Sequence, residues 1–160
     1  MEEEQRHFLA AQAVATLFPK GLLQHIATLQ QEFGGEVYLV GGTVRDLLMN
    51  KIPNDLDLTV PKEPQQWALR LQELTGGTYV ELGREEEAAR VVWQGMDVDF
   101  SGLRGGATSI AEDLEKRDIT VNALALPIAP LLQDSFCDTD LPVLDATGGC
   151  EDLKQKQIRL

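Results

Sequence analysis

The stretch EVYLVGGTVRDLLMNKIPNDLDLTV, residues 36–60, contains two strand patterns separated by a glycine turn and a short helical pattern. Its first apolar run, residues 37–40, predicts a buried strand that ends at the turn Gly41-Gly42. Residues 43–49 predict a short helix, and a further turn precedes a second strand that carries an Asp-x-Asp sequence. We therefore expect the chain to be organised around one unit of strand, turn, helix and strand.

Two aspartates in the second strand form the first candidate site. Asp55 and Asp57 lie two positions apart, so both carboxylates are expected on one face while Leu56 and Leu58 face the core. Carboxylate oxygens are ligands that Mg²⁺ prefers in proteins. Such pairs are also frequent in turns and on exposed strand faces, so the pair alone has low specificity for a metal.

The glycine turn before the helix predicts a place for phosphate. Gly41 and Gly42 have no Cβ, so a ligand can approach the backbone closely, and free N–H groups are expected at the start of the helix. Arg45 lies in the first helical turn, where it can add a charge-assisted contact. Glycine pairs before helices are more often simple turns. A carboxylate pair beside a phosphate site nevertheless suggests a nucleoside triphosphate.

Composition limits the possible partners. The chain has 160 residues, 43% of them hydrophobic, which suits one domain with a core. Its net charge of −12 argues against holding nucleic acid by bulk attraction. Cys137 and Cys150 match no metal or redox spacing, which favours a reducing cytoplasmic setting. We find no signal-peptide pattern and no apolar run long enough to span a bilayer, so we expect a soluble protein.

The segments around the central unit predict further helices and strands. Residues 1–18 and 22–33 have helical patterns, and the two histidines, His7 and His25, lack partners at catalytic spacing. A glycine-rich segment, residues 101–108, is expected to be mobile and to precede a helix capped by Thr108 or Ser109. Beyond residue 126 we expect a loop, a short hairpin and the start of a helix. The other predicted elements are a helix over residues 64–75 and strands over 78–82, 89–93 and 96–100, the last two joined by a Gln94-Gly95 turn.

Two more groups of polar residues accompany these elements. Asp97 and Asp99 alternate with apolar residues in the last strand, and one of them could stand across from the first aspartate pair. Arg117, Asp118 and Asn122 can share one rim at the start of the apolar segment 119–126, which we expect to be helical. Each group has a simpler interpretation, a solvated hairpin face or a surface ion pair worth under about 1 kcal/mol.

The ordered set of motifs resembles one family. LVGGTVRDLL, NDLDLTV, VDFSGLRG, EDLEKRDITVNALAL and LDATGGCEDLKQKQIR resemble the catalytic head domain of class II tRNA nucleotidyltransferases (CCA-adding enzymes) and bacterial poly(A) polymerases. These belong to the polymerase-beta-like nucleotidyltransferase superfamily. The resemblance covers residues 37–160. It implies an α/β (α+β) fold with a small mixed sheet and helices packed on one side.

The resemblance also implies a domain division and a set of site residues. Residues 1–34 would be an N-terminal helical segment packed outside the head, and residues 35–160 the head itself, with neck, body and tail domains absent. Lys116 stands where the family usually has arginine, and Asp97 leaves the third carboxylate less certain. The implied roles are Mg²⁺ binding and catalysis by Asp55, Asp57 and Asp99, triphosphate binding by Gly41, Gly42 and Arg45, nucleotide binding by Arg117, Asp118 and Asn122, and a flexible nucleotide-switching loop with Arg104.

The activity implied is transfer of CMP or AMP from CTP or ATP to a tRNA 3′-hydroxyl by two-metal catalysis in the cytoplasm. The tRNA 3′ end would be held mainly by domains outside this chain, in agreement with its acidic charge. Three alternatives stay open at this point. They are a poly(A) polymerase head, a nucleotide-binding head without turnover, and an acidic interaction domain in which the motifs are incidental.

Overall fold

We describe the protein from a computed structural model, which covers residues 7–16, 18–82, 88–103, 107–117, 122–132, 140–145 and 147–155. Two predicted site residues, Arg104 and Asp118, lie outside these ranges. Among the described residues, no helix is both long enough and apolar enough to cross a membrane.

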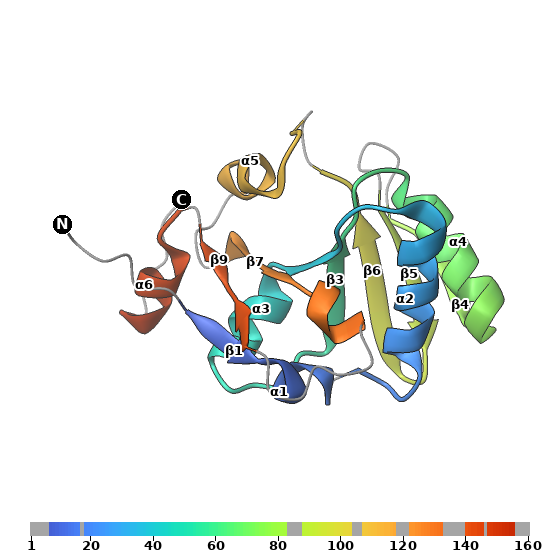
Figure 1. The fold of residues 1–160 in the computed structure, drawn as a ribbon, viewed down its shortest axis with the longest axis horizontal. Helices are drawn as coiled ribbons and strands as arrows, with labels where there is room; N and C mark the ends of the chain where they lie inside the picture. The colour runs from blue at the N-terminus through green and yellow to red at the C-terminus, as the bar shows by residue number, and fades with distance from the viewer. Residues whose placement is uncertain are drawn as a thin grey trace.

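A seven-stranded mixed sheet forms the centre of the structure (Figure 1). The strand order is β4-β5-β6-β3-β2-β7-β9, and every neighbouring pair is antiparallel except β3 with β6, which is parallel. The predicted mixed sheet is therefore confirmed. The strands are β2 (Tyr38–Val40), β3 (Asp55–Thr59), β4 (Thr78–Glu81), β5 (Ala88–Trp93), β6 (Met96–Ser101), β7 (Leu124–Pro127) and β9 (Leu144–Asp145).

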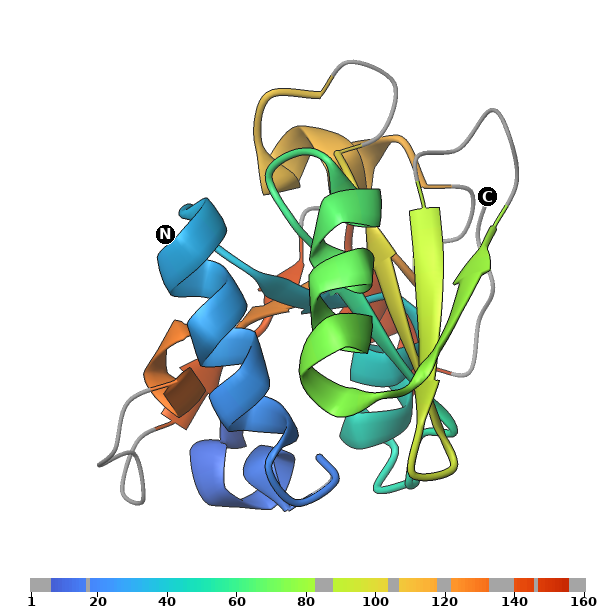
Figure 2. The ribbon, with the colours of Figure 1, turned by 90° about the vertical axis from the view of Figure 1, so that its right-hand side faces the viewer.

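Helices α2 (Leu22–Phe33) and α4 (Pro64–Thr75) lie side by side against one face of the sheet (Figures 1 and 2). Both have the predicted bounds, because an apolar residue recurs every three or four positions and glycines end both helices. The side chains that they bury are Leu22, Ile26 and Leu29 from α2 and Trp67, Ala68 and Leu71 from α4.

The two middle strands bury alternate residues against these helices. In β3, Leu56 and Leu58 are buried in the core, and in β6, Val98 and Phe100 are buried in the same cluster. The aspartates between them therefore project from the opposite face of the sheet. This alternation, predicted from the sequence, separates the carboxylates from the core.

Two short helices flank this opposite face. Helix α3 (Gly42–Leu48) connects β2 to β3, and α5 (Ile110–Glu115) follows the glycine-rich segment. The Ser109 side chain accepts a hydrogen bond from the Glu112 backbone N–H, and the Glu112 carboxylate accepts one from the Thr108 backbone N–H. This reciprocal capping pattern explains why α5 begins where the sequence predicts it.

The N-terminal region differs from the prediction of a helix over residues 1–18. Strand β1 (Phe8–Ala10) pairs antiparallel with β8 (Asp140–Pro142), and α1 (Ala11–Ala15) is the helical part of the residues described before α2. A distant partner strand satisfies the backbone of β1, and this tertiary pairing overrides the local helical preference of an alanine-rich segment. Helix α2 also does not pack outside the head, because its buried residues belong to the same core cluster as the sheet.

The prediction of a helix over residues 119–126 is wrong for the part that the structure describes. Residues 124–127 form β7, which lies between β2 and β9. Short apolar runs that are buried on both faces do not reveal their period, so they cannot be distinguished from helices by pattern alone.

The predicted hairpin beyond residue 126 is also absent from the described residues. Strand β8 pairs with β1, whereas β9 pairs with β7, so the two neighbouring strands do not pair with each other. A 3-10 helix, η3 (Ala129–Leu132), follows β7, and α6 (Gly149–Lys154) is the predicted final helix.

Candidate functional site

Four aspartates on β3 and β6 form what we name the carboxylate face. The parallel register places Asp55 beside Asp97 and Asp57 beside Asp99. All four project from the sheet face opposite the core, and neighbouring strands are only about 4.8 Å apart. The expectation that one aspartate of β6 stands across from the pair on β3 is confirmed for both.

The surroundings of Asp57 disfavour its charged form. Burial is the largest of the influences that raise the pKa of Asp57, to about 6, followed by the nearby charges of Asp99 and Asp55. The positive charges of Arg117 and Arg90 act in the opposite direction. Burial and clustered like charges are typical of a site prepared for a cation.

Thr43, which the sequence reasoning did not single out, fixes the start of β3. Its hydroxyl donates to the Asp55 carbonyl oxygen at 3.0 Å and accepts from the Asp57 backbone N–H at 3.0 Å. The side chain itself is buried. Helix α3 is thereby joined to the strand that carries the first two carboxylates, and their position is tied to the glycine turn before that helix.

Arg90 on β5 is the second residue that the sequence reasoning missed. Its Nε donates to Asp99 Oδ1 at 2.7 Å and its Nη2 donates to Asp99 Oδ2 at 3.0 Å, while Nη1 lies 3.5 Å from Asp97 Oδ2. The signal was available, because a two-residue turn at Gln94-Gly95 pairs residue 90 with residue 99.

A basic and amide cluster borders the carboxylate face at the glycine turn. Arg45 Nη1 donates to Asn122 Oδ1 at 2.8 Å, and Arg45 also pairs with Asp46 at 3.2 Å. Arg117 is largely buried and lies 3.4 Å from a carboxylate oxygen of the buried Asp113. Residues from α3, from the end of α5 and from the segment before β7 therefore meet beside the aspartates.

Gly41 lies where these groups meet. A Cβ built on Gly41 would be 3.3 Å from Arg117 Nη1, 3.7 Å from the Asn122 carbonyl oxygen and 3.8 Å from Asp57 Oδ2. The Gly41 N–H donates to the Leu124 carbonyl at 3.0 Å, so this amide is not one of the free donors that the sequence suggested.

The structure brings together most of the predicted site residues that it describes. Gly42 opens α3 beside Arg45, whose Nη2 would lie 3.2 Å from a Cβ at residue 42. Among the described residues, no group of three or more His, Cys, Asp or Glu side chains is placed so that it could hold a metal ion. The carboxylate donors suit Mg²⁺ chemically, but both oxygens of the Asp99 carboxylate accept hydrogen bonds from Arg90.

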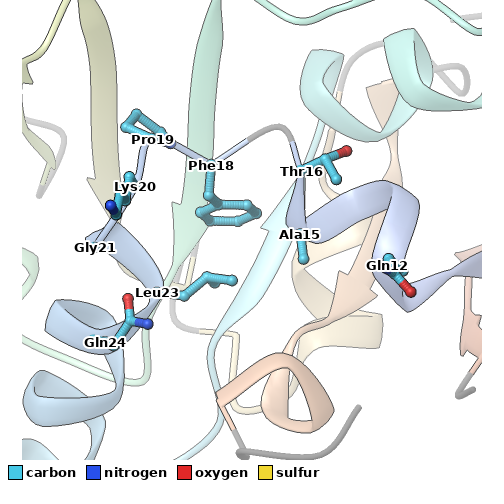
Figure 3. Close-up of a pocket in the computed structure, with 9 residues that line it drawn as sticks. All are labelled: Gln12, Ala15, Thr16, Phe18, Pro19, Lys20, Gly21, Leu23 and Gln24. Atoms are coloured by element: carbon cyan, nitrogen blue, oxygen red, sulfur yellow. The ribbon is translucent and has the colours of Figure 1, made fainter. Parts of the chain in front are cut away.

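A cavity elsewhere in the molecule does not belong to this site. A cavity of about 290 Å³ lies between the end of α1 and the start of α2, and Figure 3 shows the residues that line it. Phe18, Pro19 and Leu23 are among its lining residues, and none of the predicted site residues contributes to it.

The raised pKa of Asp57 predicts a pH-dependent stability. The folded-state pKa, about 6, lies above the reference value of 3.8, so this group stabilises the fold below pH 3.8 and that stabilisation is lost as pH rises through 6. Between pH 4 and pH 7.5, the free energy of unfolding of Asp57→Asn should rise by roughly 2 kcal/mol relative to that of the unchanged protein, because an amide stays neutral.

Urea unfolding in EDTA at both pH values measures this difference. Asp140→Asn, at an exposed position of β8, is the control and should show no pH-dependent gain. If the free energy of unfolding changed equally with pH in Asp57→Asn and in the control, the assigned environment of Asp57 would be contradicted.

The chain matches one family over most of its length. The Poly A polymerase head domain family matches residues 37–159. A CC-adding tRNA nucleotidyltransferase of Geobacter sulfurreducens is 38% identical over 136 residues, which cover 84% of this chain and 29% of that protein. This chain thus spans about three-tenths of the length of that relative.

Solved structures agree with the sequence comparison. A CCA-adding enzyme in complex with ATP has a TM-score of 0.77 and 28% identity, covering 99% of this chain and 36% of that one. A Thermotoga maritima CCA-adding enzyme in complex with tRNA has a TM-score of 0.73 and 25% identity, and the match covers 98% of this chain and 37% of that one. Both cover nearly the whole chain and about a third of the larger protein.

Proposed function

The chain belongs to the Poly A polymerase head domain family, and from this premise we propose that it is the nucleotidyl-transferring head of an enzyme that extends tRNA 3′ ends. The reaction would transfer CMP or AMP from CTP or ATP to the terminal hydroxyl. The observation that carries the proposal is the register of β3 with β6, which places four carboxylates beside a basic cluster.

The carboxylate face supplies the metal ligands in this proposal. Asp55 and Asp57 hold Mg²⁺, and Asp99 is the third carboxylate because it lies directly beside Asp57. When bound, Mg²⁺ neutralises charge on the triphosphate and lowers the pKa of the attacking hydroxyl. The raised pKa of Asp57 supports this assignment, since a cation would relieve the repulsion among the carboxylates.

The basic cluster binds the triphosphate and ribose in this proposal. Arg45 and Arg117 carry fixed positive charge at the border of the carboxylate face, and Asn122 offers an amide that already accepts from Arg45. Gly41 leaves space among these groups because it has no side chain. Arg104 and Asp118, outside the described residues, complete the nucleotide contacts implied by the family resemblance.

The tRNA itself would be held mainly by other parts of the enzyme. This chain has a net charge of −12, whereas binding of a polynucleotide normally rests on neutralising its phosphates with lysine and arginine. The relatives are about three times longer, which leaves room for such surfaces. A cytoplasmic location is part of the proposal, and the free, buried thiol of Cys150 agrees with a reducing compartment.

A transfer assay together with a binding titration tests the proposal. The chain is incubated with Mg²⁺, labelled CTP or ATP, and tRNA that lacks its 3′ end, and triphosphate binding is titrated on the same sample. We expect magnesium-dependent binding and incorporation, and the nucleotide incorporated distinguishes CC addition from CCA or poly(A) addition. Binding without incorporation would assign the chain as a nucleotide-binding head that needs its other domains, and absence of both would contradict the proposal.

A further inference from the structure

The β5–β6 hairpin places one arginine directly on the carboxylate face. Gln94 and Gly95 both have positive φ, +50° and +75°, as a two-residue turn with the right twist requires. This turn sets Arg90 opposite Asp99 and leaves no freedom of register. The strand pairing therefore fixes the position of Arg90 beside Asp99.

The contacts of Arg90 occupy the carboxylate that the proposed function needs for metal. Both Asp99 oxygens accept from the guanidinium, at 2.7 and 3.0 Å, in the planar two-pronged geometry that makes Arg–carboxylate pairs strong. A third guanidinium nitrogen lies 3.5 Å from Asp97. The Asp99 side chain is 18% exposed and the Arg90 side chain 30%, so the pair is partly shielded from water.

We propose that Arg90 is a positioning residue that serves as the counter-ion of the carboxylate face in the metal-free protein. When a divalent cation binds, it replaces the Arg90 guanidinium as the partner of Asp99. This inference rests on the proposed function and deepens it. It accounts for two observations together, the presence of four adjacent aspartates and the absence, among described residues, of a group already converged on a metal ion.

Two consequences follow for variants of Arg90. Without the guanidinium, Asp99 can turn toward Asp57 with no ion pair to break, so divalent cations should bind more tightly. The same change leaves four neighbouring carboxylates without their counter-ion, so the metal-free protein should be less stable. Opposite effects on metal affinity and on metal-free stability distinguish a counter-ion from an arginine that merely supports the hairpin.

The test uses Mn²⁺ as the probe, with free ion measured by electron paramagnetic resonance. We expect Arg90→Gln to lower the Kd for Mn²⁺ roughly tenfold, the scale set by losing competition from a bidentate charged pair. Arg90→Lys keeps the positive charge but cannot form the two parallel hydrogen bonds, so its Kd for Mn²⁺ should lie between those of Arg90→Gln and the unchanged protein. Arg70→Gln is the matched control, because Arg70 pairs with Glu32 and Glu73 on the helical side of the sheet and should leave the Kd unchanged.

Thermal unfolding of the same samples supplies the second readout. Arg90→Gln should melt several degrees below the unchanged protein in EDTA, and saturating Mn²⁺ should remove the difference. In an Asp99→Asn background, Arg90→Gln should have a much smaller effect on Mn²⁺ binding.

An unchanged or higher Kd for Arg90→Gln overturns the inference while leaving the proposed function intact. If Arg90→Gln does not fold, Arg90→Lys decides by the same criterion. Failure of the unchanged protein to bind Mn²⁺ overturns the inference together with the metal assignment under the proposed function.

Discussion

Asp57→Asn is expected to reduce nucleotide incorporation by on the order of 10³-fold or more, the scale at which removal of a group that stabilises transition-state charge acts. The change removes one negative ligand from the middle of the carboxylate face and keeps the shape of the side chain. The Thr43 hydroxyl binds the backbone N–H of residue 57, so the strand should keep its position. The loss should therefore be catalytic and not structural.

The measurement is single-turnover incorporation of labelled CTP or ATP at saturating Mg²⁺, with circular dichroism to establish folding. Asp140→Asn is again the control, since Asp140 is exposed and lies on β8, which belongs to the separate two-stranded sheet. If this chain incorporates nucleotide only with its other domains present, the pair is compared in the longer protein. Incorporation within tenfold of the unchanged protein would show that Asp57 is not a metal ligand.

Gly41→Ala is expected to lower the free energy of unfolding by about 2–4 kcal/mol, the combined scale of backbone strain and overpacking. Gly41 has φ +64° and ψ −134°, a conformation that residues with a Cβ rarely adopt. The added methyl group would also crowd Arg117 Nη1 at 3.3 Å, and its displacement should weaken triphosphate binding. Stability and nucleotide affinity should therefore fall together.

Gly34→Ala is the matched control for this variant. Gly34 also has a positive φ, +78°, but a Cβ there would meet nothing within 4 Å. We expect only the strain contribution, about 1–2 kcal/mol, and unchanged nucleotide affinity. Urea unfolding and a nucleotide titration of both variants measure the comparison. Equal losses of stability with full nucleotide affinity in both would show that the space around Gly41 is not part of the site.

Much of the fold could be predicted because its signals are local. Helices α2 and α4 have sustained apolar stripes and glycine stops, so their bounds follow from the sequence alone. The Asp-x-Asp alternation on β3 and the hairpin at Gln94-Gly95 are likewise local patterns. They correctly predicted that the aspartates of β3 and β6 lie on the sheet face opposite the core. These elements carry the predicted carboxylates, which explains why that part of the candidate site could be found.

The remaining errors concern contacts between distant segments. Strand β7 is a four-residue run buried between two other strands, and no local period marks it as extended. Strand β1 is set by pairing with β8, which the N-terminal sequence cannot reveal. Arg90 is one polar residue in an apolar strand. The hairpin register pairs it with Asp99, and the parallel pairing of β3 with β6 then brings it to the other carboxylates of the site.

The pairing of β1 with β8 also has a consequence for synthesis on the ribosome. Phe8 emerges before its partner Pro142, and every strand of the main sheet except β9 is synthesised between them. The backbone groups of β1 therefore stay unpaired until β8 has been synthesised, and such unpaired strand edges are prone to pair with other chains. We expect nascent chains that stop before β8 to depend on chaperones, and the last steps of folding to follow closure of this long-range contact.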